Sequence, residues 1–243
     1  MSLPGRPSDE VPDVLATGNG DIATLFVSMA CRHPDGADAD YLRWHTLDHR
    51  PEQHRLPEVR ASLRLVSTPE CRKARAASHG RYDEIEHVMT YFFSAPSGLD
   101  GFLELSRALG DAGRKMPLLP PVERGVYDVQ QRTATTRVKV GADVLPWWPI
   151  KGVYLLLEQG DAPTDHLTDT DGVAGVWTAT TRDVDAKLAS APSGQSLTYC
   201  FLDDDPVAVA HRLQPVVHNR STELLLAAPF HPIVPYEWDR YVP

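Results

Sequence analysis

The chain has 243 residues, 42% of them hydrophobic, which suffices for one large domain or two small ones with a packed core. Its formal net charge of −9 argues against binding nucleic acid or anionic membranes, because both need clustered Lys and Arg. No apolar run approaches the roughly 20 residues of a membrane helix. We therefore expect neither a nucleic acid nor a membrane as partner.

The three cysteines form no CxxC motif and cannot all pair with one another. Two of them fall within strand-like runs, where a thiol usually behaves as a small hydrophobic side chain. We therefore expect no metal site built on cysteine, and a reducing, cytoplasmic location. The three residues are Cys31, Cys71 and Cys200.

Residues 1–21 are rich in Pro, Gly, Asp and Ser and lack the basic and apolar segments of a secretory signal, so we predict a flexible N-terminal arm. The apolar run 24–31 predicts the first strand. Asp38 or Asp40 can cap a helix that follows and includes Trp44, His45 and His49. Pro51 should end or kink that helix.

The segments 59–66 and 85–94 predict two further strands, of which the first alternates apolar and polar residues. Between them, residues 67–81 are basic and lack apolar periodicity, which favours a solvated, mobile loop, although such a loop could also attract an anionic substrate. A helix from Ser97 or Asp100 to about 109 and a long strand over 122–136 follow. The resulting order, β-α-β-β-α-β, is typical of a ferredoxin-like unit, which we assign to residues 22–145.

The segment Pro146–Pro149 separates this unit from a second, trimmed one over residues 146–243. Strands are predicted over 151–159, 173–182, 196–203 and 224–230, with a helix that begins at Pro206. The short acidic segment 161–172 leaves room only for a turn or a degenerate helix in place of the first helix.

Each predicted half is an open sheet with helices on one side, so one apolar face of each sheet must be covered. We therefore expect an α+β fold in which two ferredoxin-like halves pack sheet to sheet as an intramolecular dimeric α/β-barrel. The space between the sheets is a natural ligand cavity. Such a chain would be a monomer, or a higher oligomer of this unit.

A set of short motifs lies between the first predicted helix and the second strand. It comprises Tyr41-Leu-Arg-Trp-His45, Asp48-His-Arg-Pro51, Leu56-Pro57 and Ala61-Ser-Leu-Arg-Leu65. This pattern resembles the EthD-like members of the dimeric α/β-barrel superfamily, in which an acidic residue and His-x-Pro follow an aromatic first helix. Glu58 and Leu65 depart from the glycine and the aromatic residue usual in that family.

The resemblance covers about residues 24–136 and implies a barrel with a pocket on each sheet. It does not imply one chemistry, since the superfamily includes monooxygenases without metal cofactors, cyclases, isomerases, haem-binding enzymes and proteins without a known reaction. The second half has no His-x-Pro step, and His166 stands in its short acidic segment. We therefore expect one functional pocket, in the first half.

His49 is the first candidate for catalysis, because imidazole exchanges protons near neutral pH, and His45 is a weaker one. The two share a helix face, but the sequence His-Thr-Leu-Asp-His lacks the glutamate and third ligand of an HExxH zinc site, so we expect no metal. Alternatively, His45 packs in the core and His49 is a cation at the helix end. Asp48 should point away from His49.

An aromatic wall with a few polar groups is predicted for ligand binding. Its members are Trp44, Arg64, His87, Met89, Tyr91 and Tyr127. Residues 87, 89 and 91 share one face of a strand through its two-residue period, and we expect residues 64 and 127 on the same sheet. This face either lines the cavity or packs under the helices.

These residues favour an EthD-like protein that binds a small apolar or aromatic molecule, with or without transforming it. As an enzyme it would be a cofactor-independent oxygenase, cyclase or isomerase. The alternatives are a non-catalytic binding protein and a haem protein with a histidine as axial ligand. The sequence has no GxGxxG, Walker or GxSxG motif, so nicotinamide, nucleotide and serine-hydrolase chemistry lack support.

Overall fold

The computed structural model describes residues 4–18, 20–161, 164 and 166–242. It contains nine strands. They are β1 (Thr24–Ala30), β2 (Val59–Val66), β3 (Ala77–Ser78), β4 (His87–Phe93), β5 (Pro121–Ala134), β6 (Gly152–Gln159), β7 (Val173–Thr181), β8 (Gln195–Leu202) and β9 (Glu223–Pro232). The eight predicted strands are all present, and only the two-residue β3 was not predicted.

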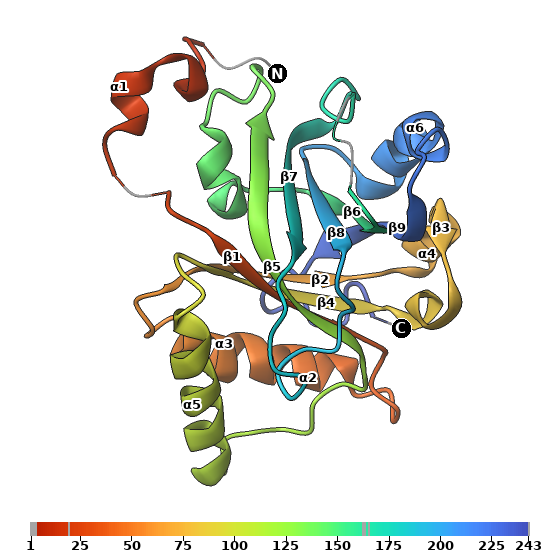
Figure 1. Cartoon of the computed structure of the whole chain (residues 1–243). Coiled ribbons are helices and arrows are strands. Elements are labelled where there is room, and N and C mark those ends of the chain that lie inside the picture. Colours follow the sequence, from red (N-terminus) through yellow and green to blue (C-terminus); the bar gives the residue numbers. More distant parts are fainter. Residues whose placement is uncertain (1–3, 19, 162–163, 165, 243) are drawn as a thin grey trace.

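All neighbouring strands are antiparallel and follow the order β2-β4-β1-β5-β7-β8-β6-β9-β3 (Figure 1). Because β2 also pairs with β9, eight of the strands close into a barrel and β3 lies outside the ring. The first half contributes β2-β4-β1-β5 and the second half β7-β8-β6-β9. The predicted α+β class and the barrel are therefore confirmed.

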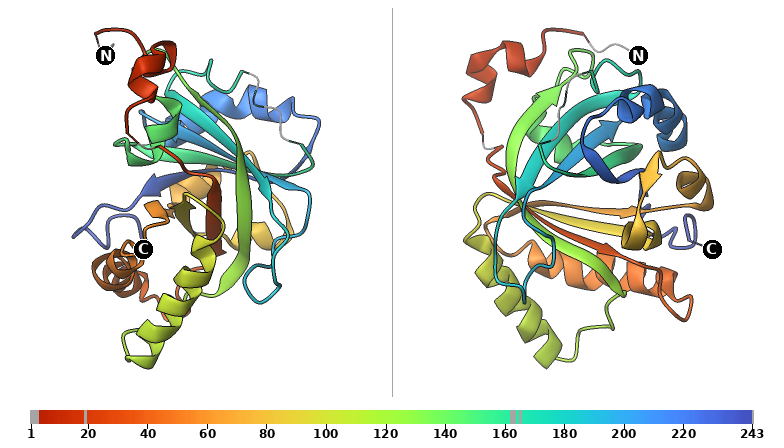
Figure 2. Two further views of the ribbon diagram at one scale, coloured as in Figure 1. Left: turned by 60° about the vertical axis from the view of Figure 1, so that its left-hand side comes forward. Right: turned by 45° about the vertical axis from the view of Figure 1, so that its right-hand side comes forward.

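Three longer helices lie outside the barrel. They are α2 (Asp38–Trp44), α5 (Gly98–Asp111) and α6 (Pro206–His218). Figure 2 shows α2 and α5 on the outer face of the first half and α6 on the second half. The second half has no helix between β6 and β7 among its described residues; residues 162, 163 and 165 of the predicted turn lie outside them.

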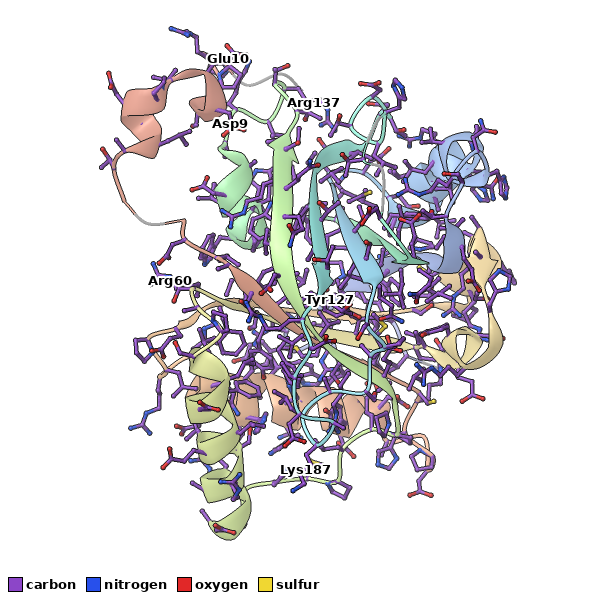
Figure 3. All side chains as sticks on the ribbon, in the orientation of Figure 1. Asp9, Glu10, Arg60, Tyr127, Arg137 and Lys187 are labelled. Atoms are coloured by element: carbon purple, nitrogen blue, oxygen red, sulfur yellow. The ribbon has the colours of Figure 1, made fainter. Side chains whose placement is uncertain are left out.

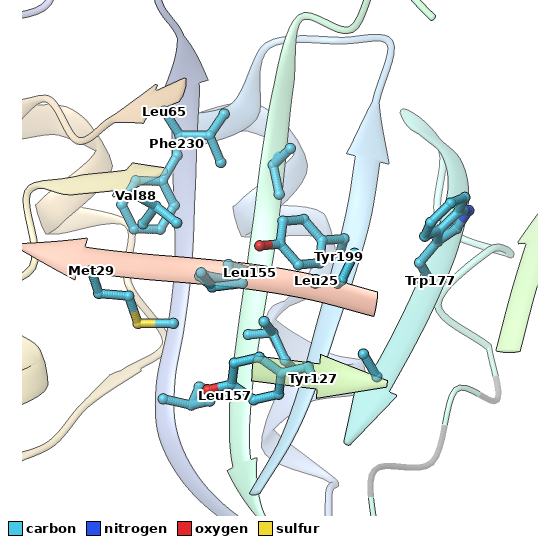
Figure 4. Packing of buried hydrophobic residues seen from close by; sticks show 14 of the residues in the cluster. Leu25, Met29, Leu65, Val88, Tyr127, Leu155, Leu157, Trp177, Tyr199 and Phe230 are labelled. Atoms are coloured by element: carbon cyan, nitrogen blue, oxygen red, sulfur yellow. The ribbon is translucent and has the colours of Figure 1, made fainter. Parts of the chain in front are cut away.

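Large apolar side chains fill the barrel interior, where the two sheets face each other (Figure 4). Phe92 of the first half contacts Trp177 and Tyr199 of the second, with ring centroids 6.0 and 6.3 Å apart. The Thr90 hydroxyl lies 2.5 Å from the Tyr199 hydroxyl and joins the sheets by a buried hydrogen bond. Burial of this apolar surface drives the association of the two halves.

The helix that follows β1 changes its geometry before Pro51. Regular α-helix ends at Trp44, and the next turn, η2 (His45–His49), is a wide π-helical turn in which the Arg50 N–H bonds to the His45 carbonyl. The short helix α3 (Arg50–Gln53) then continues the chain. A proline has no N–H and clashes with the carbonyl four residues earlier, and a π turn accommodates both effects. The predicted end of the regular helix is therefore confirmed, but the π turn was not foreseen.

The basic connection 67–81 is folded, so the prediction of a solvated loop is wrong. It contains α4 (Pro69–Lys73) and β3, and is followed by a short 3₁₀ turn, η3 (Gly80–Glu84). Its arginines form ion pairs within the chain: Arg72 pairs with Glu86, and Arg81 pairs with Glu123. These partners neutralise arginine charges that, from the sequence alone, we expected on a solvated basic loop.

The predicted N-terminal arm contains two short helical segments, η1 (Ser8–Glu10) and α1 (Pro12–Leu15); its residues 1–3 and 19 lie outside the described part. The Ser8 N–H donates to the Lys139 carbonyl at 2.9 Å, and Asp9 accepts from the Ala142 N–H at 3.2 Å. Ala142 begins a further 3₁₀ turn, η4 (Ala142–Trp147), between the halves. No helix within the described ranges has the length and apolar character needed to cross a membrane.

Candidate functional site

A cavity of about 160 Å³ lies in the first half, between the outer face of its sheet and the helices α2 and α5. Its apolar wall includes Phe26, Tyr41, Met89, Tyr91, Phe102 and Leu119. Its polar lining includes His45, His49, Arg64, Ser106, Lys115 and Arg124. An apolar recess with a few polar groups is the usual form of a small-molecule site.

The prediction that the cavity lies between the two sheets is wrong, because core side chains fill that space. Alternate residues of β4 separate the two environments: Val88, Thr90 and Phe92 face the barrel interior, whereas Met89 and Tyr91 face the helices. The face that carries residues 87, 89 and 91 thus packs under the helices, as the alternative predicted, and does not face a space between the sheets. The cavity that Met89 and Tyr91 line lies on the helix side.

His49 lines the cavity and is almost fully buried, with 7% of its surface exposed. Its ring stacks on that of Trp44 at 5.0 Å, and its Nε2 lies 3.4 Å from the Gln53 side-chain nitrogen, which in turn donates to Ser106. No hydrogen-bond partner for its Nδ1 exists in the described part of the chain. The π turn, the indole and the amide together fix the orientation of this imidazole.

Burial and the nearby Lys115 cation lower the pKa of His49 from 6.5 to about 4. The imidazole is therefore neutral at physiological pH, with a hydrogen on one ring nitrogen and a lone pair on the other. Asp48 does point away, as predicted, and its carboxylate accepts from Arg114 at 3.1 Å. The burial and the low pKa of His49 thus favour a neutral ring over the alternative of a cation at the helix end.

His45 lies on the same wall, with its ring centroid 5.6 Å from that of His49. Its Nε2 is 3.3 Å from the Tyr91 hydroxyl, while its Nδ1 has no partner among the described residues. Burial and the Arg64 charge hold the pKa of His45 well below its usual value. Burial also raises the pKa of Tyr91, so the pair is a neutral imidazole beside a protonated phenol.

Of the other predicted ligand-binding residues, Arg64, Met89 and Tyr91 line the cavity. Trp44 lies behind His49 and donates its indole N–H to the Arg114 carbonyl at 3.0 Å, so it supports the wall from behind.

His87 shares the face of Met89 but is bound to Asp38, with 2.7 Å between its Nε2 and the carboxylate. Asp38 also accepts from the His33 N–H, and this pairing replaces the predicted helix cap. Burial lowers the pKa of His87, which favours a neutral ring that donates to the carboxylate. His87 therefore anchors α2 to the sheet.

The placement of Tyr127 on the cavity face is wrong. Tyr127 and Phe92 both pair with Leu25 in the sheet, and residues directly opposite one another lie on the same face, which here is the barrel interior. Tyr127 donates there to Gln195 at 3.2 Å. Figure 3 labels Tyr127 among the strands of the barrel.

Sequence reasoning missed the cations at the far wall. Lys115 follows α5 and Arg124 lies on β5, and neither stands in a recognisable motif. The loop between β7 and β8 reaches this wall from the second half: the N–H groups of Ser190 and Ala191 donate to the Arg124 carbonyl, and Leu188 packs against the apolar cluster beside the cavity. Lys187 marks this loop in Figure 3.

The cavity volume is close to the roughly 150 Å³ that holds a benzene molecule, which favours a ligand of about one ring and not a tetrapyrrole. Nor do three His, Cys, Asp or Glu side chains converge on a possible metal position anywhere in the described part of the chain. The residues at hand support proton transfer, hydrogen bonding and anion pairing.

Comparison with known proteins finds similarity at the level of structure only. No family model and no curated protein sequence matches the chain. An anthrone oxidase-like protein is 10% identical, with a TM-score of 0.50, over 88% of this chain and 92% of its own. A chlorite dismutase-like protein is 9% identical, with a TM-score of 0.52, over 88% of this chain and 96% of its own. A monooxygenase-like protein from Lactobacillus acidophilus gives a TM-score of 0.41 at 9% identity, over 87% of this chain and 92% of its own.

At such identities the first two matches show the fold and nothing finer. Both span nearly the whole chain and include both halves of the barrel. The predicted dimeric α/β-barrel fold is confirmed at this level.

Proposed function

We propose that this chain is an EthD-like enzyme that transforms a small apolar or aromatic molecule in the cavity of its first half. The observation that carries the proposal is the pair of buried, neutral histidines, each with a ring nitrogen that has no partner among the described residues, on the wall of an otherwise largely apolar cavity. The fold shared with an anthrone oxidase-like protein is compatible with such a substrate.

His49 is the proposed acid–base group. Neutral imidazole accepts a proton from an acidic C–H or O–H of the substrate, and the resulting imidazolium returns it at another position. Gln53 and Trp44 hold the ring in place during both steps. His45 and Tyr91 form a second neutral pair, which orients a polar substituent of the substrate's aromatic ring.

Turnover of a panel of monocyclic phenols and aromatic acids in air, followed by mass spectrometry, tests the proposal. The wild type should convert at least one compound, and His49→Gln should slow its conversion by about 10²- to 10⁴-fold while binding persists. Arg60→Met, on the same strand as Arg64 but outside the cavity lining, is the control and should leave the rate unchanged. Equal rates for His49→Gln and wild type would contradict the role of His49.

A non-catalytic binding protein is the second candidate, favoured by the low pKa of His49, which makes it a weak base in the empty protein. This candidate predicts that a bound compound is recovered unchanged after prolonged incubation. We expect no cofactor, and protein produced with added haem should lack the absorption band at about 400 nm of a ligated haem. A strong band would show that the cavity opens further than it does here.

We infer that the two halves are ferredoxin-like units fused in tandem. When the strands of each half are numbered along the chain, both halves have the spatial order second, third, first, fourth: β2-β4-β1-β5 and β7-β8-β6-β9. This shared order supports the inference. Because the halves cover each other's sheets, the chain should be a monomer by light scattering. The cytoplasmic location stays a prediction from its three unpaired cysteines.

A further inference from the structure

Arg64 is a buried cation whose charge has no counter-ion in the described part of the chain. It lies on β2 with 4% of its surface exposed, and it lines the cavity. Its Nη2 donates to the Tyr41 hydroxyl at 3.3 Å, and its guanidinium lies 5.3 Å from the centre of the same ring. No carboxylate within the described residues pairs with it, and its Nε has no hydrogen-bond partner there.

The chain pairs its other deeply buried arginines. The Arg220 side chain, 3% exposed, binds Glu158 through two hydrogen bonds of 2.6 Å. The Arg75 side chain, 4% exposed, lies 3.5 Å from Asp83 and also donates to the Asp83 carbonyl at 2.8 Å. A buried charge is strongly unfavourable unless it is paired, so Arg64 is the exception that needs an explanation.

The rest of the cavity lining has the same sign of charge. Lys115 and Arg124 are its other charged residues, and neither forms an ion pair with a described residue. The chain has 33 acidic residues against 24 Lys and Arg, yet no Asp or Glu is among the residues that line the cavity. The two histidines are neutral and supply no negative charge. The charged side chains of the lining are therefore all cationic, which favours an anionic ligand.

We propose that the ligand is a monocyclic aromatic carboxylate whose carboxylate pairs with Arg64. A guanidinium presents its N–H groups as a planar fork that matches a carboxylate, and we assign the two Nη groups of Arg64, one of which also donates to Tyr41, as the donors here. The ring packs among Phe26, Met89, Tyr91 and Phe102. The cavity volume of about 160 Å³ limits the apolar part to about one ring. This inference specifies the substrate class of the proposed function and rests on it.

Binding of benzoate and of its neutral analogue benzamide, measured by calorimetry on the full chain, tests the assignment. Wild type should bind benzoate at least about tenfold more tightly than benzamide, as charge-assisted hydrogen bonds predict. Arg64→Met should reduce benzoate affinity to that of benzamide. Arg60→Met removes an arginine from the same strand, paired there with Asp21 at 3.1 Å, and should keep the full preference.

The outcomes separate this inference from the proposed function. Equal affinities of wild type for the two compounds would overturn the anion site but leave an aromatic-binding cavity. A benzoate preference that survives in Arg64→Met would overturn the role of Arg64. Binding of neither compound would overturn the inference together with the proposed cavity for aromatic ligands.

A direct measurement covers the case in which Arg64→Met does not fold. The ¹⁵Nε signal of Arg64 in the wild type, assigned with Arg64→Lys, should shift on addition of benzoate and stay in place with benzamide, because only benzoate brings a carboxylate to this guanidinium. An unmoved signal at saturating benzoate would overturn the proposal.

Discussion

The low pKa of His49 makes a quantitative prediction about stability against pH. The folded chain holds this pKa at about 4, whereas an exposed histidine titrates near 6.5. The unfolded chain therefore takes up the proton first as the pH falls. The contribution of His49 to stability is complete above about pH 6.5 and is lost progressively between about pH 6.5 and 4. At about 1.36 kcal/mol per pKa unit, the full loss is about 3 kcal/mol.

Urea unfolding followed by tryptophan fluorescence, at about pH 7 and about pH 4.5, measures this effect. Carboxylates also titrate in this range, so the informative comparison is with His49→Gln, which keeps a polar side chain beside Gln53 but does not titrate. Between the two pH values, wild type should lose about 2 kcal/mol more than the variant. An NMR titration of the His49 ring gives the pKa directly.

Two results would refute this reasoning. One is an equal loss of stability in wild type and His49→Gln between the two pH values. The other is a His49 ring that titrates near 6.5 in the folded protein. Either would mean that the imidazole is accessible to water and that the wall of the cavity is looser than the stacking on Trp44 indicates.

Three further predictions concern the barrel and the cavity wall. Glu158→Ala leaves Arg220 buried and unpaired and should lower the free energy of unfolding in urea by about 3–5 kcal/mol. The control Glu237→Ala removes an exposed ion pair and should lower it by under about 1 kcal/mol. Similar losses in the two variants would contradict this prediction. Thr90→Val should lower the free energy of unfolding by about 1–3 kcal/mol because the Tyr199 hydroxyl loses its partner, and adding Tyr199→Phe should recover part of that loss. If the effects of the two substitutions simply add, the prediction is contradicted. Tyr91→Phe should weaken benzoate binding less than Arg64→Met does, and calorimetry of both variants checks this order.

The sequence predicts the elements well because their signals are local. The bounds of β2, Val59–Val66, match the alternating pattern, and Pro206 begins α6 as an N1 proline, supported by Asp205, which accepts from two N–H groups. The π turn at His45–His49 has no such local signal, because its hydrogen bonds reach one residue further without changing the apolar pattern.

The candidate site depends on contacts between segments that are distant in the sequence, and these contacts are harder to predict from sequence. The motif from Trp44 to Pro51 identified both cavity histidines. The sheet face of Tyr127 follows from its register against Leu25, and a slip of one residue would reverse that face. The charges of residues 67–81 likewise find partners that the sequence does not identify, such as Glu123 for Arg81.

Ligand should bind on the helix side of the first sheet and not inside the barrel. Two methionines report on the two places: Met89 lines the cavity, and Met29 lies in the barrel interior with 1% of its surface exposed. Methyl NMR of methionine-labelled protein, assigned by Met→Leu variants, follows both during addition of benzoate. We expect the Met89 methyl to shift and saturate while the Met29 methyl stays in place. A shift of Met29 with Met89 unmoved would contradict it.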